Sequence, residues 1–313
     1  DIGIWTSPDG INWQEITVPT GVPNRRHQRT TIGISPSDEN IVYFLRSVGD
    51  EHYLMRYDAL TQTIEDRSEA IPAFGGEIGD YTSQGSYDQF VAVHPDNSDI
   101  VYLGGANLWR STNGFSSDDA TDWVGGYSEF RKDRGSIGLY NIHHPDQHAV
   151  VFYPNNSRVM LSAHDGGISK TTNNRRQGRS DVLNEDNQKV DEVTVIWEDL
   201  NNGYLTTQFY AIGMEENTAG DPILVGGMQD NSTFAVFGGN PQEDWVDLFG
   251  GDGAYCEITY NSIMVSAQVG SMGRYAFDEQ TGEFLGFSRI SPPDGGDGPF
   301  LFINPFLADP IQP

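Results

Sequence analysis

Three stretches of the sequence decide the fold: Thr31–Tyr43 (TIGISPSDENIVY), Phe90–Tyr102 (FVAVHPDNSDIVY) and Val150–Leu161 (VVFYPNNSRVML). Each has a short apolar run, a turn rich in polar residues and proline, and a second apolar run, which is the pattern of a β-hairpin. The turn prolines fall at 36, 95 and 154, so the interval is 59 residues both times. A hairpin that returns at a fixed interval indicates a repeat architecture. Weaker copies follow at Ala211–Val225, Glu257–Val265 and Leu301–Pro310.

Each repeat continues with two further strand-like segments. Third segments are Leu108–Ser111 and Gly167–Lys170, and a polar hairpin then leads to a fourth segment that often opens with tryptophan: Trp13, Trp123, Trp197 and Trp245. Four short strands in roughly 40–60 residues are typical of one blade of a β-propeller. We therefore predict an all-β propeller of four-stranded blades, with about five blades readable, as a single domain over residues 1–313.

Both ends of the sequence cut through predicted blades. The chain opens on a third strand, Gly3–Thr6, and stops just after an inner-strand turn at Asn304–Pro305. We therefore expect it to be a segment of a longer polypeptide.

Composition excludes several classes of protein. The chain has 18 Lys+Arg against 45 Asp+Glu, a formal net charge of −27, which repels nucleic acid and anionic membrane surfaces. No apolar stretch reaches the roughly 18 residues of a membrane span, so we expect neither nucleic acid binding nor membrane insertion. The single Cys256 excludes an internal disulfide and a cysteine zinc site, and its strand-like context predicts a buried, inert thiol.

The segment Ser7-Pro8-Asp9-Gly10-Ile11-Asn12-Trp13 resembles an Asp-box, the BNR repeat of sialidases and related propellers. A degenerate copy begins at Ser111. The resemblance implies that the Asp9 side chain ties the turn between a third and a fourth strand, and that Trp13 packs between blades. Asp and Gly suit a tight hairpin, so we interpret Ser7, Asp9, Gly10 and Trp13 as structural residues.

Strand order brings two sets of loops to one face of a propeller. These are the loops before the inner strands and those between second and third strands. Asp146 and Asp252 each lie eight residues before equivalent positions, Pro154 and Tyr260. We expect these loops to direct one group of polar side chains toward the channel face: Asp88, Asp146, His148, His164, Asp165, Gln229, Asp230, Asn231 and Asp252.

Five motifs, in order, sharpen the resemblance: HPDQHAVVFYP, HDGGISKT, NNGYLTTQFYAI, GGMQDNST and GGDGAY. They are similar to secreted bacterial propellers related to sortilin-type propellers and to the xyloglucanase-like enzymes of glycoside hydrolase family 74. The resemblance covers roughly residues 85–310. It implies a seven-bladed propeller when complete, an extracellular or cell-surface location, and a carbohydrate ligand.

Three interpretations of the channel-face residues stay open. The first is glycoside hydrolysis by two carboxylates, Asp146 and Asp252, with Asp165, Asp230 and Asp88 as substitutes; this chemistry requires no cofactor. The second is a divalent metal site, with His144, Asp146 and His148 for a transition metal, or Asp165, Asp230 and Asp252 for calcium. The third is structural, with Asp and His bonding neighbouring backbone amides.

The leading hypothesis for function is a secreted or cell-surface propeller that interacts with a polysaccharide or glycan, with hydrolysis as its catalytic form. The alternative is a non-catalytic binding or scaffold module of a large bacterial surface protein. Its partners would be other domains of the same chain or other surface proteins.

Overall fold

The computed structural model describes residues 3–24, 28–76, 78–128, 138–184, 186–202, 207–215, 223–237, 242, 244–259, 261–278, 284–293, 295 and 299–308. The chain divides into two compact units, Asp1–Tyr204 and Leu205–Pro313, and each is described by itself. All sheets are antiparallel, and no α-helix occurs in the described residues. None of the described helical segments is long and apolar enough to span a membrane.

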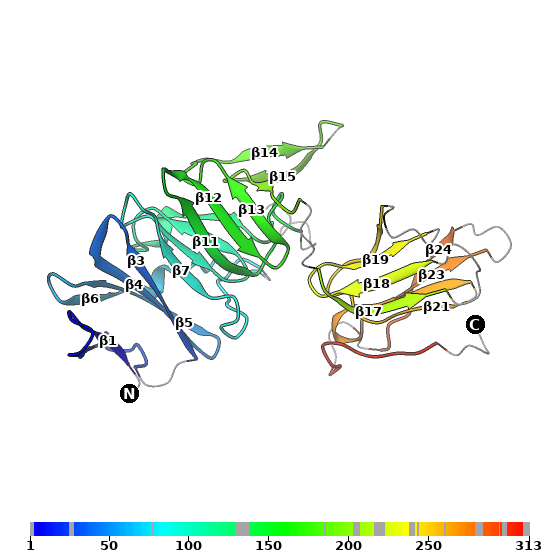
Figure 1. Ribbon diagram of the computed structural model, residues 1–313, viewed down its shortest axis with the longest axis horizontal. Coiled ribbons are helices and arrows are strands. Elements are labelled where there is room, and N and C mark those ends of the chain that lie inside the picture. The colour runs from blue at the N-terminus through cyan, green and yellow to red at the C-terminus, as the bar shows by residue number, and fades with distance from the viewer. Residues whose placement is uncertain are drawn as a thin grey trace. The chain divides into compact units, whose positions relative to one another are not determined.

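The described residues of the first unit form three four-stranded sheets, one two-stranded sheet and a hairpin (Figure 1). The two-stranded sheet pairs β1 (Ile4–Thr6) with β2 (Gln14–Ile16). The four-stranded sheets follow in chain order: β3 (Arg29–Ser35), β4 (Asp38–Val48), β5 (Glu51–Asp58) and β6 (Thr63–Asp66); β7 (Phe90–Val93), β8 (Val101–Gly104), β9 (Leu108–Ser111) and β10 (Thr121–Gly125); β11 (Gln147–Tyr153), β12 (Asn156–His164), β13 (Gly167–Thr171) and β16 (Glu198–Asp199). The hairpin is β14 (Ser180–Leu183) with β15 (Lys189–Val193), and two short 3-10 turns are η1 (Ser68–Ala70) and η2 (Asp118–Ala120).

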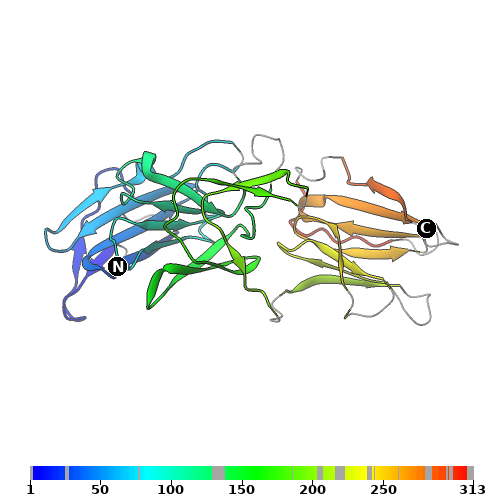
Figure 2. The same ribbon diagram turned by 90° about the horizontal axis from the view of Figure 1, so that it is seen from above.

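The second unit contains two four-stranded sheets, whose strands lie side by side in Figure 2. Their strands are β17 (Phe209–Met214), β18 (Leu224–Met228), β19 (Thr233–Val236) and β20 (Val246–Phe249), then β21 (Cys256–Thr259), β22 (Ser262–Ser266), β23 (Met272–Phe277) and β24 (Phe284–Arg289). A 3-10 turn, η3 (Gln268–Gly270), joins β22 to β23.

The sheets confirm the predicted fold class. The three repeated stretches form β3–β4, β7–β8 and β11–β12, and every four-stranded sheet keeps its strands in chain order, as a propeller blade does. The described residues form five four-stranded sheets, a number compatible with the five blades readable from the sequence. One prediction was wrong: the weak copy at Leu301–Pro310 forms no strand over its described part, 301–308. The seven-blade total and the single domain over 1–313 stay predictions.

Neighbouring blades of one unit meet through their inner strands, where glycine allows the backbones to approach. A Cβ on Gly33 in β3 would lie 2.9 Å from the Val91 carbonyl oxygen in β7. A Cβ on Gly213 in β17 would lie 3.1 Å from the Cys256 carbonyl oxygen in β21. In both units, therefore, a glycine allows the inner strands of two neighbouring blades to approach closely.

Two buried tyrosines bridge neighbouring blades of the first unit. The Tyr43 hydroxyl donates to the Ser98 carbonyl at 3.1 Å, and the Tyr102 hydroxyl donates to the Asn174 carbonyl at 3.1 Å. Tyr43 and Tyr102 are also 59 residues apart, and both are fully buried. The repeat therefore places one tyrosine at each of these two junctions between blades.

In the second unit, the Cys256 thiol is free and buried, as predicted.

The turn after β1 is organised by Asp9, as predicted. Asp9 Oδ1 accepts from the backbone N–H of Ile11 at 2.8 Å and of Asn12 at 2.7 Å, and Gly10 N–H donates to Ser7 Oγ at 2.8 Å. These bonds, led by that from Asn12, hold the pKa of Asp9 well below its usual value. The side chain is therefore committed to the turn.

The same turn chemistry recurs after β9 and after β13. Phe115 N–H donates to Ser111 Oγ at 2.9 Å, and Ser116 N–H to Asn113 Oδ1 at 3.2 Å. After β13, Asn173 N–H donates to Thr171 Oγ1 at 3.2 Å, a copy that the sequence comparison missed because Thr and Asn replace Ser and Asp.

The predicted packing of Trp13 was wrong. Trp123 and Trp197 are buried within the first unit, whereas Trp13 is 59% exposed. Trp13 lies just before β2 in a sheet of only two strands, which presents too little apolar surface to cover an indole.

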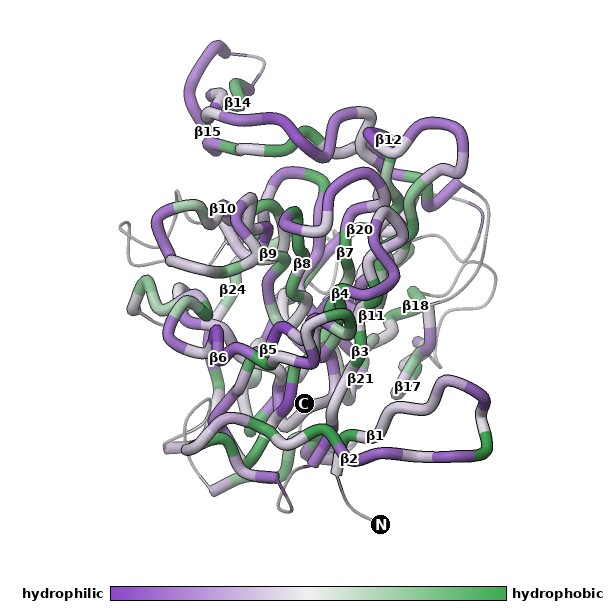
Figure 3. Tube along the Cα trace, turned by 90° about the vertical axis from the view of Figure 1, so that its left-hand side faces the viewer, coloured by the Kyte–Doolittle hydropathy of each residue, from purple (hydrophilic) through white to green (hydrophobic). Residues whose placement is uncertain are grey.

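The β14–β15 hairpin projects from the third sheet of the first unit in Figure 1 and is mainly hydrophilic in Figure 3. Its base is held by buried Asp191, which accepts from Ser128 Oγ at 2.6 Å and from Asn141 N–H at 2.9 Å. The hairpin is thus a polar insertion anchored at one end.

Candidate functional site

In the first unit, Asp146 lies in the loop before β11 in a left-handed conformation (φ 62°). Its N–H donates to the Ala106 carbonyl at 3.0 Å, and its carboxylate accepts from the Gln84 side-chain amide. A carboxylate oxygen of Asp146 lies within 4.8 Å of one of Asp165, which belongs to the β12–β13 loop. The structure therefore brings together two of the predicted carboxylates of this unit.

His148 and Asp165 form a direct pair beside this loop. His148 Nε2 contacts Asp165 Oδ1, and the Tyr87 ring meets the imidazole edge-on, with centroids 5.3 Å apart. The Asp165 side chain is 10% exposed and that of His148 37%. The histidine is therefore the solvent-facing member of this pair.

Asp88 is the most unusual group in this region. It is 1% exposed, and neither carboxylate oxygen accepts a hydrogen bond from another described residue. Burial raises the pKa of Asp88 to about 7; the charge of Asp165 adds to the shift, while Asp88's own N–H, His148 and Arg29 oppose it. Asp88 is thus a protonatable carboxyl near neutral pH.

The loop that leads to Asp88 is strained. Gln84 (φ 46°), Gly85 (φ 68°) and Ser86 (φ 74°) take the left-handed conformation in succession. Non-glycine residues adopt it only where the surroundings enforce it, and such residues cluster at functional sites.

His164 is buried, and its predicted ligand-binding role stays a prediction. Ser169 Oγ donates to the Ile142 carbonyl and accepts from His164 Nε2 at 2.9 Å, so the other ring nitrogen, Nδ1, carries no proton. The rings of His143 and His164 have centroids 4.6 Å apart. Burial lowers the pKa of His164 to about 3, which keeps this imidazole neutral.

The three side chains predicted as transition-metal ligands have different neighbours. The His144 ring lies over that of His164, with centroids 6.2 Å apart, and its Nδ1 is 3.2 Å from the Pro145 carbonyl oxygen. Asp146 accepts from Gln84, and His148 pairs with Asp165. The metal assignment of these residues stays a prediction.

In the second unit, the loop before β21 and the β22–β23 loop meet through Asp252. Asp252 Oδ1 accepts from Asp230 N–H at 3.1 Å, and Asp252 N–H donates to Gln268 Oε1 at 2.9 Å. Gln229 accepts from the Tyr210 hydroxyl, and the Asn231 side-chain amide donates to the Gln229 carbonyl at 3.0 Å. The predicted residues of this unit therefore share a polar network at the expected loops, and the catalytic pairing of Asp146 with Asp252 stays a prediction.

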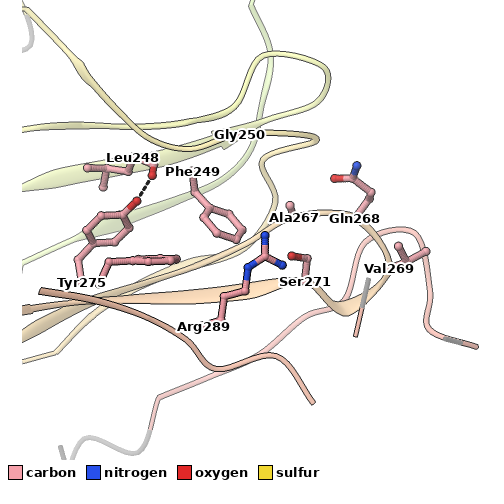
Figure 4. Close-up of a pocket in the computed structure, with 10 residues that line it drawn as sticks. Leu248, Phe249, Gly250, Ala267, Gln268, Val269, Ser271, Tyr275 and Arg289 are labelled. Carbon is pink, nitrogen blue, oxygen red and sulfur yellow. Dashed lines mark hydrogen bonds between the residues drawn. The ribbon is translucent and has the colours of Figure 1, made fainter. Parts of the chain in front are cut away.

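Next to this network, the second unit holds a cavity of about 560 Å³ (Figure 4). The residues that carry its chemistry are Phe249, Gln268, Ser271, Tyr275, Phe287 and Arg289. They come from the end of β20, the β22–β23 loop, β23 and β24. A cavity of this size that combines aromatic rings with a few polar groups fits a small ligand or one or two sugar rings.

Phe287 forms an exposed aromatic platform in this cavity. Its ring centroid is 4.9 Å from that of Tyr275 and 6.0 Å from that of Phe249, and Phe287 is 43% exposed. The Tyr275 hydroxyl donates to the Leu248 carbonyl, which fixes the second ring. A Cβ at Gly273 would lie only 2.5 Å from the Phe287 ring, so glycine at this position of β23 makes room for the platform.

The cavity rim also holds a strained residue. Val269 lies in the β22–β23 loop at φ 48°, although a β-branched side chain strongly disfavours that conformation. Its N–H donates to the Phe302 carbonyl at 3.0 Å. Strained residues such as Val269 cluster at ligand-binding sites, so the strain supports a functional role for this loop.

The sequence predicted the loops but not the cavity. Gln268 lies in a loop between a second and a third strand, and Gly250 lies beside the predicted Asp252 in the loop before β21; strand order predicts that loops of both kinds lie on the channel face. Phe287 and Arg289 were missed. Their alternation along FLGFSR is typical of a strand with one functional face, but the sequence does not show which residues of β20 and β23 lie opposite them.

The ordered four-stranded sheets define the class of protein as a β-propeller type, and comparisons add no narrower family. No family model matches the chain, and no curated protein matches it. A nidogen/laminin complex matches with TM-score 0.30 and 7% identity, over 90% of this chain and 85% of that chain. A family 74 xyloglucanase from Xanthomonas campestris matches with TM-score 0.33 and 11% identity, over 88% of this chain and 50% of that one.

An ancestral family 74 enzyme matches with TM-score 0.27 and 13% identity, over 85% of this chain and 39% of that one. The chain therefore spans half or less of the length of these two family 74 structures. At such TM-scores the likeness carries no functional argument, and function rests on the sites themselves.

Proposed function

We propose that this chain is a carbohydrate-binding propeller segment whose binding site is the cavity beside Phe287. The observation that carries the proposal is an exposed aromatic platform next to hydrogen-bonding groups from Gln268, Ser271 and Arg289. A sugar ring has an apolar face that packs on an aromatic ring and hydroxyl groups around its edge that need polar partners. The cavity offers both in one place.

Binding without catalysis is the favoured form of this function. No carboxylate belongs to the described residues that line the cavity, and Asp252 beside it is bonded to Asp230 N–H and Gln268. Glycoside hydrolysis requires two carboxylates that reach the scissile bond. The cavity therefore supports recognition of a sugar better than its cleavage.

Hydrolysis in the first unit is the second candidate function. The oxygens of Asp146 and Asp165 approach within 4.8 Å, close to the separation of about 5–5.5 Å used by retaining glycosidases, and the Asp88 pKa near 7 suits a proton donor. Asp88 and Asp146 are 1% and 8% exposed, however, so access for a polysaccharide is narrow.

The remaining parts of the proposal extend the sequence resemblance. The Asp9 turn and its two copies support an Asp-box interpretation of the hairpins after β1, β9 and β13. We further propose an exported protein, with glycans or surface proteins as partners. Calcium at the acidic loops is a separate hypothesis.

The test is a glycan array with the 313-residue chain, followed by titration calorimetry of the glycans it retains. Phe287→Ala should weaken binding about tenfold, because an aromatic contact contributes about 0.5–1.5 kcal/mol beyond its buried area. Phe284→Ala is the matched control, since Phe284 lies on the same strand, is 54% exposed and does not line the cavity. Equal loss in both variants, or no bound glycan, would refute the proposal.

A further inference from the structure

Arg289 differs from most of the other described basic side chains of this acidic protein. The two described lysines are ion-paired, Lys170 with Glu198 and Lys189 with Asp181 and Glu192. Most described arginines of the first unit bond to carboxylates, side-chain oxygens or backbone carbonyls, such as Arg110 with Asp122. Arg289 forms no hydrogen bond or ion pair with any residue that the structure describes. It is unpaired in a chain with 45 acidic residues and 18 basic ones.

Arg289 is placed where it can contact a ligand bound in the cavity. It is the last residue of β24, two positions beyond Phe287, so both side chains project from the same face of the strand. Figure 4 shows the guanidinium extending into the cavity between Phe249 and Ser271. A ligand packed on Phe287 would therefore lie within reach of this cation.

Two other polar side chains of the cavity, Gln268 and Ser271, can also donate hydrogen bonds. Gln268 Oε1 accepts from Asp252 N–H, and its NH₂ group, which bonds to no described residue, is available to donate to a ligand. The Ser271 hydroxyl forms no hydrogen bond within the described part of the chain. A guanidinium, an amide NH₂ and a hydroxyl together suit a ligand that is rich in acceptors.

We infer that the sugar recognised at this cavity carries a carboxylate, as a uronic acid does, and that Arg289 binds it. The inference rests on the proposed function and narrows its ligand class. The planar guanidinium matches the two oxygens of a carboxylate with parallel N–H donors, a geometry that adds specificity as well as affinity.

The net charge of −27 does not oppose this assignment at physiological salt. Repulsion between an anionic ligand and exposed carboxylates is largely screened beyond about 8 Å at 0.15 M ionic strength. Asp252, whose N–H donates to the cavity residue Gln268, accepts the Asp230 N–H, which offsets part of its field. Contacts within the cavity therefore decide the preference.

The experiment compares acidic oligosaccharides with their carboxyl-reduced, neutral counterparts by titration calorimetry in 0.15 M NaCl. Oligogalacturonides, alginate oligosaccharides and glucuronoxylan fragments serve as probes, and a sulfated neutral oligosaccharide is a third arm. We expect the native chain to prefer an acidic probe over its reduced form by about tenfold or more, since hydrogen bonds to charged groups are the strong ones. Arg289→Gln should abolish that preference and leave binding of the reduced form unchanged, and Arg289→Lys should retain only part of it.

The outcomes separate the inference from the function on which it rests. Equal binding of acidic and reduced probes, with Phe287→Ala weakening both, would overturn the inference and leave carbohydrate binding standing. A preference for the sulfated arm over the carboxylated one would overturn the carboxylate assignment. Binding of no probe, or binding insensitive to Phe287→Ala, would overturn both.

Discussion

Replacing Asp88 with asparagine should remove a pH-dependent destabilisation of the first unit. Asp88 is 1% exposed and has no hydrogen-bond donor from another described residue, so ionisation in place is costly. The pKa moves from 3.8, the value expected in the unfolded chain, to about 7 in the folded one. At about 1.4 kcal/mol per pH unit, this difference corresponds to about 4 kcal/mol.

The sign follows from proton binding. Between about pH 4 and pH 7 the folded state holds a proton on Asp88 that the unfolded state has released, so stability falls as pH rises. Below pH 4 the group contributes nothing, and above pH 7 the whole destabilisation is present. Asp88→Asn keeps the shape without the charge, so the variant should gain on the native chain progressively from pH 4 to pH 8.

The assay is urea unfolding of both chains at pH 4, 5, 6, 7 and 8, followed by tryptophan fluorescence. The quantity to compare is the difference in unfolding free energy between the variant and the native chain at each pH. The asparagine amide also lacks hydrogen-bond partners, and this cost lowers the stability of the variant by the same amount at every pH. Glu69→Gln, at an exposed position of η1, is the control for removing one negative charge. If Asp88→Asn and the native chain lost stability in parallel from pH 4 to pH 8, the account of Asp88 would be refuted.

Three further predictions test the packing and turns. Tyr102→Phe should cost about 1 kcal/mol in urea unfolding, because one buried hydrogen bond between blades is lost; an unchanged midpoint would contradict that role. Gly33→Ala should cost about 1–3 kcal/mol from the close Val91 carbonyl, whereas Gly250→Ala, which meets nothing within 4 Å, should cost much less. Asp9→Ala should destabilise the β1–β2 hairpin and raise its amide hydrogen exchange above pH 4, and unchanged protection would count against the turn assignment.

The repeat made the strands predictable, and tertiary packing limited the rest. The 59-residue interval located β3–β4, β7–β8 and β11–β12, because a turn proline between two apolar runs is a local signal. Trp13 shows where prediction from local sequence stops. Its motif correctly predicted the Asp9 turn, which depends on neighbouring residues only. Burial of the indole depends instead on what covers the two-stranded sheet. The strand expected from the weak copy is absent over 301–308 for a similar reason, since an apolar run forms a strand only beside a partner.

The features of the candidate site also divide into those that strand order predicts and those that depend on tertiary packing. Strand order assigned the Gly250 and Gln268 loops to one face, and the cavity opens beside them. The burial of Asp88 and the approach of Arg289 to Phe249 depend on strands far apart in sequence. Composition and motif spacing therefore cannot predict either feature. The loop position of His164 could be predicted, but its burial and its bond to Ser169 could not.

The central claim is that the cavity beside Phe287 binds carbohydrate, and a crystal structure of the chain with an oligosaccharide retained from the glycan array tests it most directly. The account predicts a sugar ring packed on Phe287, with polar contacts from Gln268 or Arg289. An oligosaccharide bound elsewhere, with this cavity holding only water, would contradict it.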